Sequence, residues 1–104
     1  MEKRREERYR KRLECEFSGA GMTYKGFVSD VSARGMFIRT RSGFREDSGV
    51  DVKIYLPGDG ISNVSGVVRR ALRYQELNLV KNGMGIELMQ MDDNYLRLVN
   101  TLTN

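Results

Sequence analysis

The feature that most constrains the fold of this chain is a repeated alternation of apolar and polar side chains over short segments. Alternation with a period of two puts one set of side chains on the buried face of a strand and the other set in water. The predicted strands cover residues 13–17, 22–31, 35–40, 50–56, 64–74 and 84–88. Five or six short strands at regular spacing predict a small antiparallel barrel.

The period changes at the C-terminal end of the chain. Apolar residues at 95, 96, 99 and 102 recur at helical spacing after Asp92-Asp93, which are good N-cap residues. We therefore expect one helix packed on the barrel. Between the strands, the segment 57–60 (PGDG) predicts a turn, and Asn82-Gly83 fits a tight hairpin turn.

Length and composition exclude several classes of protein. A chain of 104 residues allows one domain, and no apolar run approaches the ~20 residues of a membrane span. The first twelve residues contain no apolar stretch, so we expect no secretory signal and a cytoplasmic location. Cys15 is the only cysteine, which excludes an internal disulfide and suits a reducing compartment.

The chain contains no histidine. This removes Ser-His-Asp and Cys-His catalysis, and a single thiol cannot build a zinc site. Cys15 alternates with Leu13 and Phe17, so it is interpreted as a small buried hydrophobic residue rather than a nucleophile. We expect a protein that is not an enzyme and that holds no metal or cofactor.

The positive charge is concentrated at one end. Residues 1–12 carry seven basic and three acidic residues, so this segment accounts for the whole net charge of +4. Residues 13–104 are neutral overall. We therefore divide the chain into a basic N-terminal arm (1–12), helical or disordered by itself, and a barrel domain with its helix (13–104). Of the 18 basic residues 13 are arginine, which favours recognition of anions.

Two short motifs stand in order along the chain. The first is an RxxxR formed by Arg8 and Arg12, just before the first predicted strand. The second is a DxSxxG formed by Asp30, Ser32 and Gly35, between the second and third. Alone, the first would be a solvated tail or a non-specific polyanion binder, and the second an Asx-type turn. Their order, spacing and strand context make the combination more specific.

Together the motifs resemble the PilZ domain family, which binds the bacterial second messenger cyclic di-GMP. The resemblance covers the whole chain, including the segment 83–88 (GMGIEL), which is similar to the family's last strand. It implies an all-β, six-stranded antiparallel barrel with a C-terminal helix, and a connection longer than a tight turn before that strand. Lys11 stands where the family often has proline, which leaves both arginines in place.

The resemblance also implies a ligand site. Arg8 and Arg12 would clamp cyclic di-GMP, and Asp30, Ser32 and Gly35 would contact it on the barrel face. An alternative RxxxR register uses Arg4 and Arg8; the first is preferred because the family's second arginine immediately precedes the first strand. The possible additional contacts are Arg4, Arg10 and Arg34.

The chemistry of these side chains suits that ligand. An arginine fork can grip phosphate or the O6 and N7 acceptors of guanine, and Asp30 can accept from the N1–H and N2–H donors of guanine. The Ser32 hydroxyl can donate or accept. Gly35 can adopt positive φ and allows close approach of a ligand.

The expected function is a stand-alone receptor or adaptor that binds cyclic di-GMP and signals to an unidentified effector protein through a changed surface. One rival is a small barrel that binds nucleic acid through its basic arm. The neutral barrel and the lack of a dense aromatic platform argue against specific nucleic-acid binding. Another rival is a ligand-free PilZ-like scaffold that acts only through protein contacts.

Overall fold

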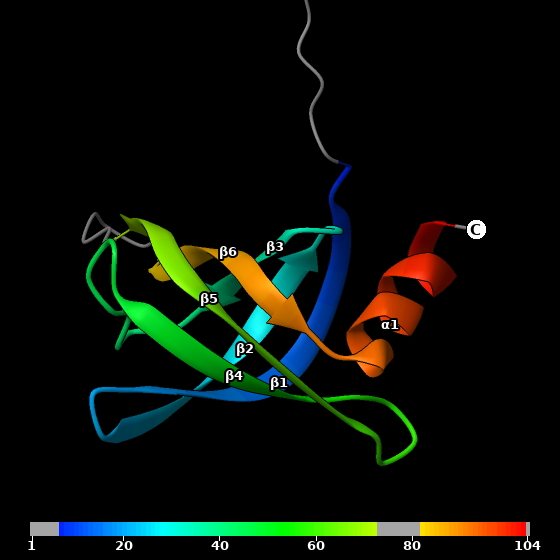
Figure 1. Ribbon diagram of the computed structural model, residues 1–104, viewed down its shortest axis with the longest axis horizontal. Helices are drawn as coiled ribbons and strands as arrows, with labels where there is room; N and C mark the ends of the chain where they lie inside the picture. The colour runs from blue at the N-terminus through cyan, green and yellow to red at the C-terminus, as the bar shows by residue number, and fades with distance from the viewer. Residues whose placement is uncertain (1–6, 73–81, 104) are drawn as a thin grey trace, which may run out of the picture.

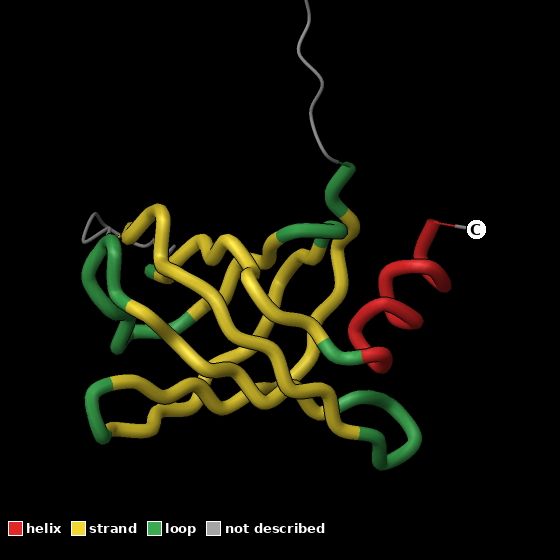
Figure 2. The backbone as a smooth tube through the Cα atoms, viewed as in Figure 1, coloured by secondary structure: helices red, strands yellow, loops and turns green. Residues whose placement is uncertain are grey.

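The computed structural model describes residues 7–72 and 82–103, and in them the chain forms an all-β barrel with one helix (Figure 1). The helix α1 follows the last strand and lies at the side of the barrel (Figure 2). The elements are β1 (Tyr9–Gly19), β2 (Met22–Val31), β3 (Gly35–Arg39), β4 (Gly49–Tyr55), β5 (Ile61–Leu72), β6 (Gly83–Met91) and α1 (Asp93–Thr103). The predicted fold class is confirmed.

The strands close in the order β1-β2-β3-β6-β5-β4, and every neighbouring pair is antiparallel. The closing pair is short, because β4 pairs with β1 only along Cys15–Ser18. Among the described strands, the first half of β1 is therefore paired on one side only, with β2. This part of β1, which has one unpaired edge, lies at the end of the barrel where the candidate site is found.

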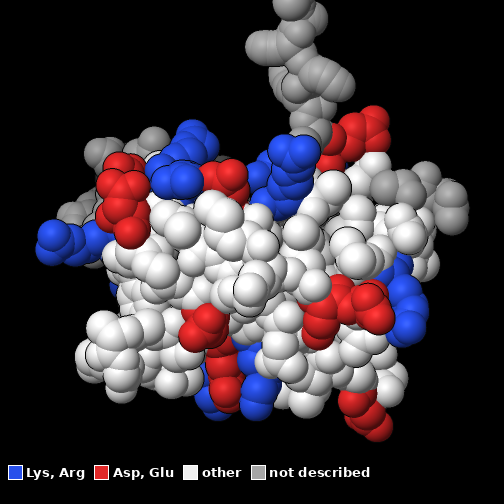
Figure 3. All heavy atoms as spheres, viewed as in Figure 1, with Lys and Arg blue, Asp and Glu red and all other residues white. Residues whose placement is uncertain are grey.

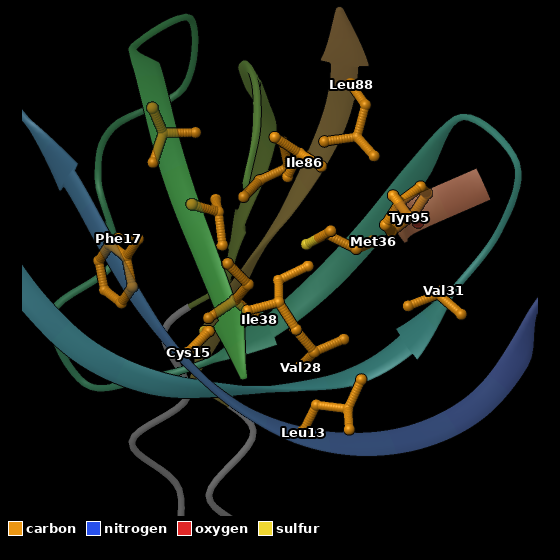
Figure 4. Packing of buried hydrophobic residues seen from close by; sticks show 14 of the residues in the cluster. Leu13, Cys15, Phe17, Val28, Val31, Met36, Ile38, Ile86, Leu88 and Tyr95 are labelled. Carbon is orange, nitrogen blue, oxygen red and sulfur yellow. The ribbon is translucent and has the colours of Figure 1, made fainter. Parts of the chain in front are cut away.

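The barrel interior is filled by the inward-facing side chains of all six strands and two residues of α1 (Figure 4). In β4 the buried and exposed residues alternate strictly, as the sequence predicted. Cys15 is 2% exposed, which confirms its interpretation as a buried hydrophobic residue. Burial, and then the charge of Glu16, raises the pKa of the Cys15 thiol to about 12, so the thiolate is not accessible at neutral pH.

The helix begins where the sequence placed its cap. The Oδ1 atom of Asp92 accepts from the backbone N–H of Tyr95 at 2.9 Å, which satisfies one of the free donors of the first turn. Tyr95 and Val99 are buried against the barrel, whereas Leu96 is exposed. Among the described residues, no helix has the length and apolar character needed to cross a membrane.

The predicted start of the first strand was wrong. β1 begins at Tyr9 rather than at residue 13, because Tyr9 and Arg10 pair with Val31 and Asp30 of β2. A register shift between Arg10 and Leu13 interrupts the alternation, so the pattern does not reveal the earlier residues as a strand. Part of the segment assigned to the arm therefore belongs to the barrel, and residues 1–6 lie outside the described residues.

The connection between β5 and β6 is longer than a tight turn. Leu72 pairs with Gly83, so Asn82-Gly83 is not a two-residue hairpin and residues 73–82 join the two strands. The predicted strand end at residue 74 lies outside the described residues. β5 also begins at Ile61, three residues before the predicted start.

Candidate ligand site

The two sequence motifs meet where β1 begins, β2 ends and β3 begins. The Nη1 atom of Arg8 donates to Oδ1 of Asp30 at 2.5 Å. The Arg8 side chain is 48% exposed and that of Asp30 is 29% exposed, so the ion pair lies at the surface. The pairing follows from the register, because Arg10 is opposite Asp30 and the chain before it runs past the end of β2.

Ser32 shapes the turn between β2 and β3. Its side chain is fully buried. Its hydroxyl oxygen accepts from the N–H of Gly35 at 3.1 Å, and the Ser32 N–H donates to the Gly35 carbonyl at 2.9 Å. The structure thus puts the hydroxyl inside the turn, where it holds the DxSxxG backbone in shape.

Gly35 is required by close packing. A Cβ at this position would lie 2.7 Å from the carbonyl oxygen of Ile86 in β6, closer than side chains tolerate. The prediction that positive φ explains this glycine was wrong, because Gly35 is not among the positive-φ residues. The same Cβ position lies 3.8 Å from Nη2 of Arg8, so the guanidinium of Arg8 packs against the backbone of Gly35.

Arg12 lies on the outer face of β1 and β2. Its guanidinium carbon is 4.0 Å from the centre of the Phe27 ring, a cation–π contact. A shallow groove of about 490 Å³ borders this pair. The residues that line it are Arg12, Glu14, Cys15, Glu16, Lys25, Gly26, Phe27 and Tyr55. An aromatic ring beside an arginine offers a flat surface of the kind on which a nucleobase stacks.

The predicted additional residues occupy different positions. Arg10 is exposed in β1, opposite Asp30. Arg34 is exposed in the turn, and its carbonyl accepts from the Leu88 N–H at 2.8 Å. Arg4 lies outside the described residues. The structure therefore brings together Arg8, Asp30 and Gly35, with Arg10 on the paired strand.

Acidic groups lie close to the basic ones at the start of β1. The Tyr9 hydroxyl donates to Oε1 of Glu7 at 2.6 Å, and this hydrogen bond, with partial desolvation, raises the pKa of Tyr9. Figure 3 shows basic and acidic side chains next to each other where the described chain begins, and a largely uncharged surface across the middle of that face. On this face the basic groups at the start of β1 are therefore accompanied by acidic ones.

Sequence reasoning missed two residues of this region, Phe27 and Tyr95. Phe27 precedes the inward-facing Val28, so the alternation could have shown that its ring faces outward beside Arg12. Tyr95 was interpreted only as part of the apolar stripe of α1. A buried tyrosine needs a partner for its hydroxyl, and Tyr95 finds one in the Ser32–Gly35 turn.

The chemistry of the candidate site is that of hydrogen-bonding, charged and stacking groups. Within residues 7–72 and 82–103, no group of three or more His, Cys, Asp or Glu side chains is gathered as a metal site. What the site offers is an exchangeable guanidinium, a carboxylate acceptor and a flat aromatic surface. These groups suit an anionic ligand that carries bases.

Comparison with known proteins identifies the family and the fold of the chain. A family model described as PilZ domain matches residues 2–104. A solved structure described as the Bacillus subtilis inhibitor of motility (MotI/DgrA) is similar in fold, with a TM-score of 0.79 and 17% sequence identity. The similarity covers 99% of this chain and 50% of that one, so the chain spans about half the length of that protein. No sequence among the curated proteins matches the chain.

Proposed function

The chain belongs to the PilZ domain family, and on that premise we propose that it is a non-catalytic receptor for cyclic di-GMP. The proposed receptor passes the signal to a partner protein through a change in its surface. The single observation that carries the proposal is the Arg8–Asp30 ion pair over the backbone of Gly35, which joins the two motifs in one place.

The exposure of that ion pair supports a role in ligand capture. An ion pair between partly exposed side chains contributes only about 0–1 kcal/mol, so Arg8 can exchange Asp30 for a phosphate at little cost. A charge-assisted hydrogen bond to phosphate is stronger than a neutral one. Once Arg8 turns to the ligand, Asp30 becomes free to accept from the N1–H and N2–H donors of guanine.

Arg12 and Phe27 would supply the contacts to the second part of the ligand. The guanidinium of Arg12 lies over the ring of Phe27, a contact that limits the freedom of the arginine before binding. A guanine base could stack on this pair while its phosphate faces Arg8. Ser32 would act through the turn it holds, and Gly35 through the close approach it allows.

The proposed function is tested by isothermal titration of the protein with cyclic di-GMP, with GTP and a DNA oligonucleotide as controls. Saturable binding of cyclic di-GMP alone supports the receptor. Binding of the oligonucleotide with no preference for cyclic di-GMP would favour a nucleic-acid-binding barrel. Absence of binding to all three would favour a scaffold that acts through protein contacts.

Hydrogen exchange then locates the response. For a receptor, cyclic di-GMP should slow exchange of the amides in residues 8–13 and in residues 30–35 together. A basic tail that binds any polyanion would respond to the oligonucleotide and leave residues 30–35 unchanged. The pattern of protection therefore separates a specific site from general attraction to phosphate.

A further inference from the structure

Tyr95 connects α1 to the turn that carries the DxSxxG motif. Its side chain is fully buried and belongs to the same core cluster as Val31 and Met36 (Figure 4). The hydroxyl donates toward the carbonyl oxygens of Ser32 at 2.8 Å and Gly35 at 3.0 Å. A tyrosine hydroxyl has one proton, so the two carbonyls share it.

This hydroxyl sits at the base of the turn. The Gly35 carbonyl accepts from Tyr95 and also from the Ser32 N–H, so one oxygen holds both the turn and the helix. The turn continues directly from Asp30, which is paired with Arg8. A shift of the Ser32 carbonyl would therefore move the backbone of the turn that lies beside this ion pair.

Tyr95 is held from its other end as well. Its backbone N–H donates to Oδ1 of Asp92. The same Oδ1 atom also accepts from the hydroxyl of Ser62 in β5 at 2.7 Å. The Oδ2 atom of Asp92 accepts from the Asn63 N–H at 2.7 Å. Tyr95 is thus bonded at its backbone, through Asp92, to β5, and at its hydroxyl to the turn between β2 and β3.

We infer that Tyr95 is a positioning residue of the ligand site, which holds the Ser32–Gly35 turn in its binding shape and connects it to α1. This inference rests on the proposed function. Coupling between two sites is reciprocal, so a ligand that binds the held turn more tightly must in return strengthen the contact of Tyr95. The helix α1 is then the element in which a partner protein can sense the bound state.

The test is the substitution Tyr95→Phe, which keeps the ring and removes the hydroxyl. We expect about two- to tenfold weaker binding of cyclic di-GMP by isothermal titration, the range that corresponds to one lost hydrogen bond. In the protein without ligand, the amides of Ser32 and Gly35 should exchange faster. Ligand should slow exchange of the α1 amides in the unsubstituted protein and have less effect on them in Tyr95→Phe.

Two control variants separate positioning from general loss of stability. Val52→Ala loosens the core packing of β4 opposite Phe17, at the end of β1 away from the turn, and Tyr24→Phe removes a hydroxyl that bonds only to Met22 in the described structure. Both should bind cyclic di-GMP as the unsubstituted protein does. Unchanged affinity in Tyr95→Phe, or an equal loss in Val52→Ala, would overturn the inference.

Failure of the proposed function is a distinct outcome. If the unsubstituted protein does not bind cyclic di-GMP, the amides of Ser32 and Gly35 still report on the turn. Faster exchange in Tyr95→Phe would then support the positioning of the turn while the ligand assignment falls. Unchanged exchange would remove the positioning role itself.

Discussion

Arg8 is ion-paired with Asp30, a residue 22 positions later in the chain, across the junction of β1 and β2. The pair connects the RxxxR motif to the DxSxxG motif directly, without an intervening side chain. Because both groups are partly exposed, the pair can open without disturbing the core. The arginine that anchors the start of the barrel is thus also the one proposed to capture the ligand.

Replacement of either motif arginine should weaken ligand binding and leave the fold intact. We expect Arg8→Ala and Arg12→Ala each to lower the affinity for cyclic di-GMP about ten- to hundredfold, since a charge-assisted contact contributes roughly 1.5–3 kcal/mol. Isothermal titration and thermal unfolding measure both effects. Arg45→Ala, in the exposed connection before β4, is the matched control. Unchanged affinity in Arg12→Ala alone would move the site to the Arg4/Arg8 register, and unchanged affinity in both variants would move it away from the motif.

Asp30→Ala should weaken binding with a different dependence on salt. Contacts between arginine and phosphate are screened by added salt, whereas hydrogen bonds to base edges respond less. We therefore expect the slope of affinity against salt for Asp30→Ala to match that of the unsubstituted protein, and the slope for Arg8→Ala to be shallower. Similar loss of slope in both variants would argue against a base contact by Asp30. Titrations at several salt concentrations give these slopes.

Gly35→Ala should destabilise the barrel. The added methyl group would lie 2.7 Å from the backbone carbonyl oxygen of Ile86, which cannot move aside as a flexible side chain could, and overpacking of this kind costs about 1–3 kcal/mol. Gly49→Ala is the matched control, because nothing lies within 4 Å of its Cβ position. Its free energy of unfolding should change by less than about 0.5 kcal/mol. Denaturant unfolding of the two variants checks the contrast; equal stability would contradict it.

Asp92 should make the stability of the protein depend on pH in the acid range. Partial burial opposes ionisation, but the hydrogen bonds from Asn63, Ser62 and Tyr95 outweigh it and lower the pKa of Asp92 below 3.8. A lowered folded pKa gives stability that is present above the unfolded pKa of about 3.9 and lost as pH falls through the folded value. The carboxylate thus stabilises the protein at neutral pH.

The variant Asp92→Asn tests this contribution. Its Nδ2 group cannot accept from the Asn63 N–H, so we expect a loss of about 0.5–2 kcal/mol at pH 7. The difference from the unsubstituted protein should shrink as pH falls below about 4. Asp93→Asn, in the exposed first turn of α1, should show a smaller effect. A difference that stays constant down to low pH would exclude the charge of Asp92 as its cause.

Much of the fold could be predicted from the alternation of side chains. The bounds of β2 match the prediction. The exposed and buried residues of β4 alternate as predicted, because one face of the strand packs in the core and the other faces water. The cap at Asp92 was also predictable, since its chemistry is local. The start of β1 was not, because a register shift breaks the period there.

The candidate site was predicted in part. The motifs named Arg8, Asp30 and Gly35, and the structure brings these three together. The inward direction of the Ser32 hydroxyl and its link to Tyr95 depend on how α1 packs on the barrel, and no local pattern carries that information. The reason for Gly35 likewise lies in β6, about fifty positions away in sequence, rather than in its own φ angle.

The single-sided pairing of the first half of β1 has a consequence for self-association. A strand with an unpaired edge can recruit the strand of another molecule, which leads to aggregation. Here the edge carries Arg10, Lys11 and Arg12, whose charges repel an identical strand. The basic residues near the ligand site therefore also oppose edge-to-edge pairing of β1 between two molecules. A polyanion that neutralises their charges would remove this repulsion.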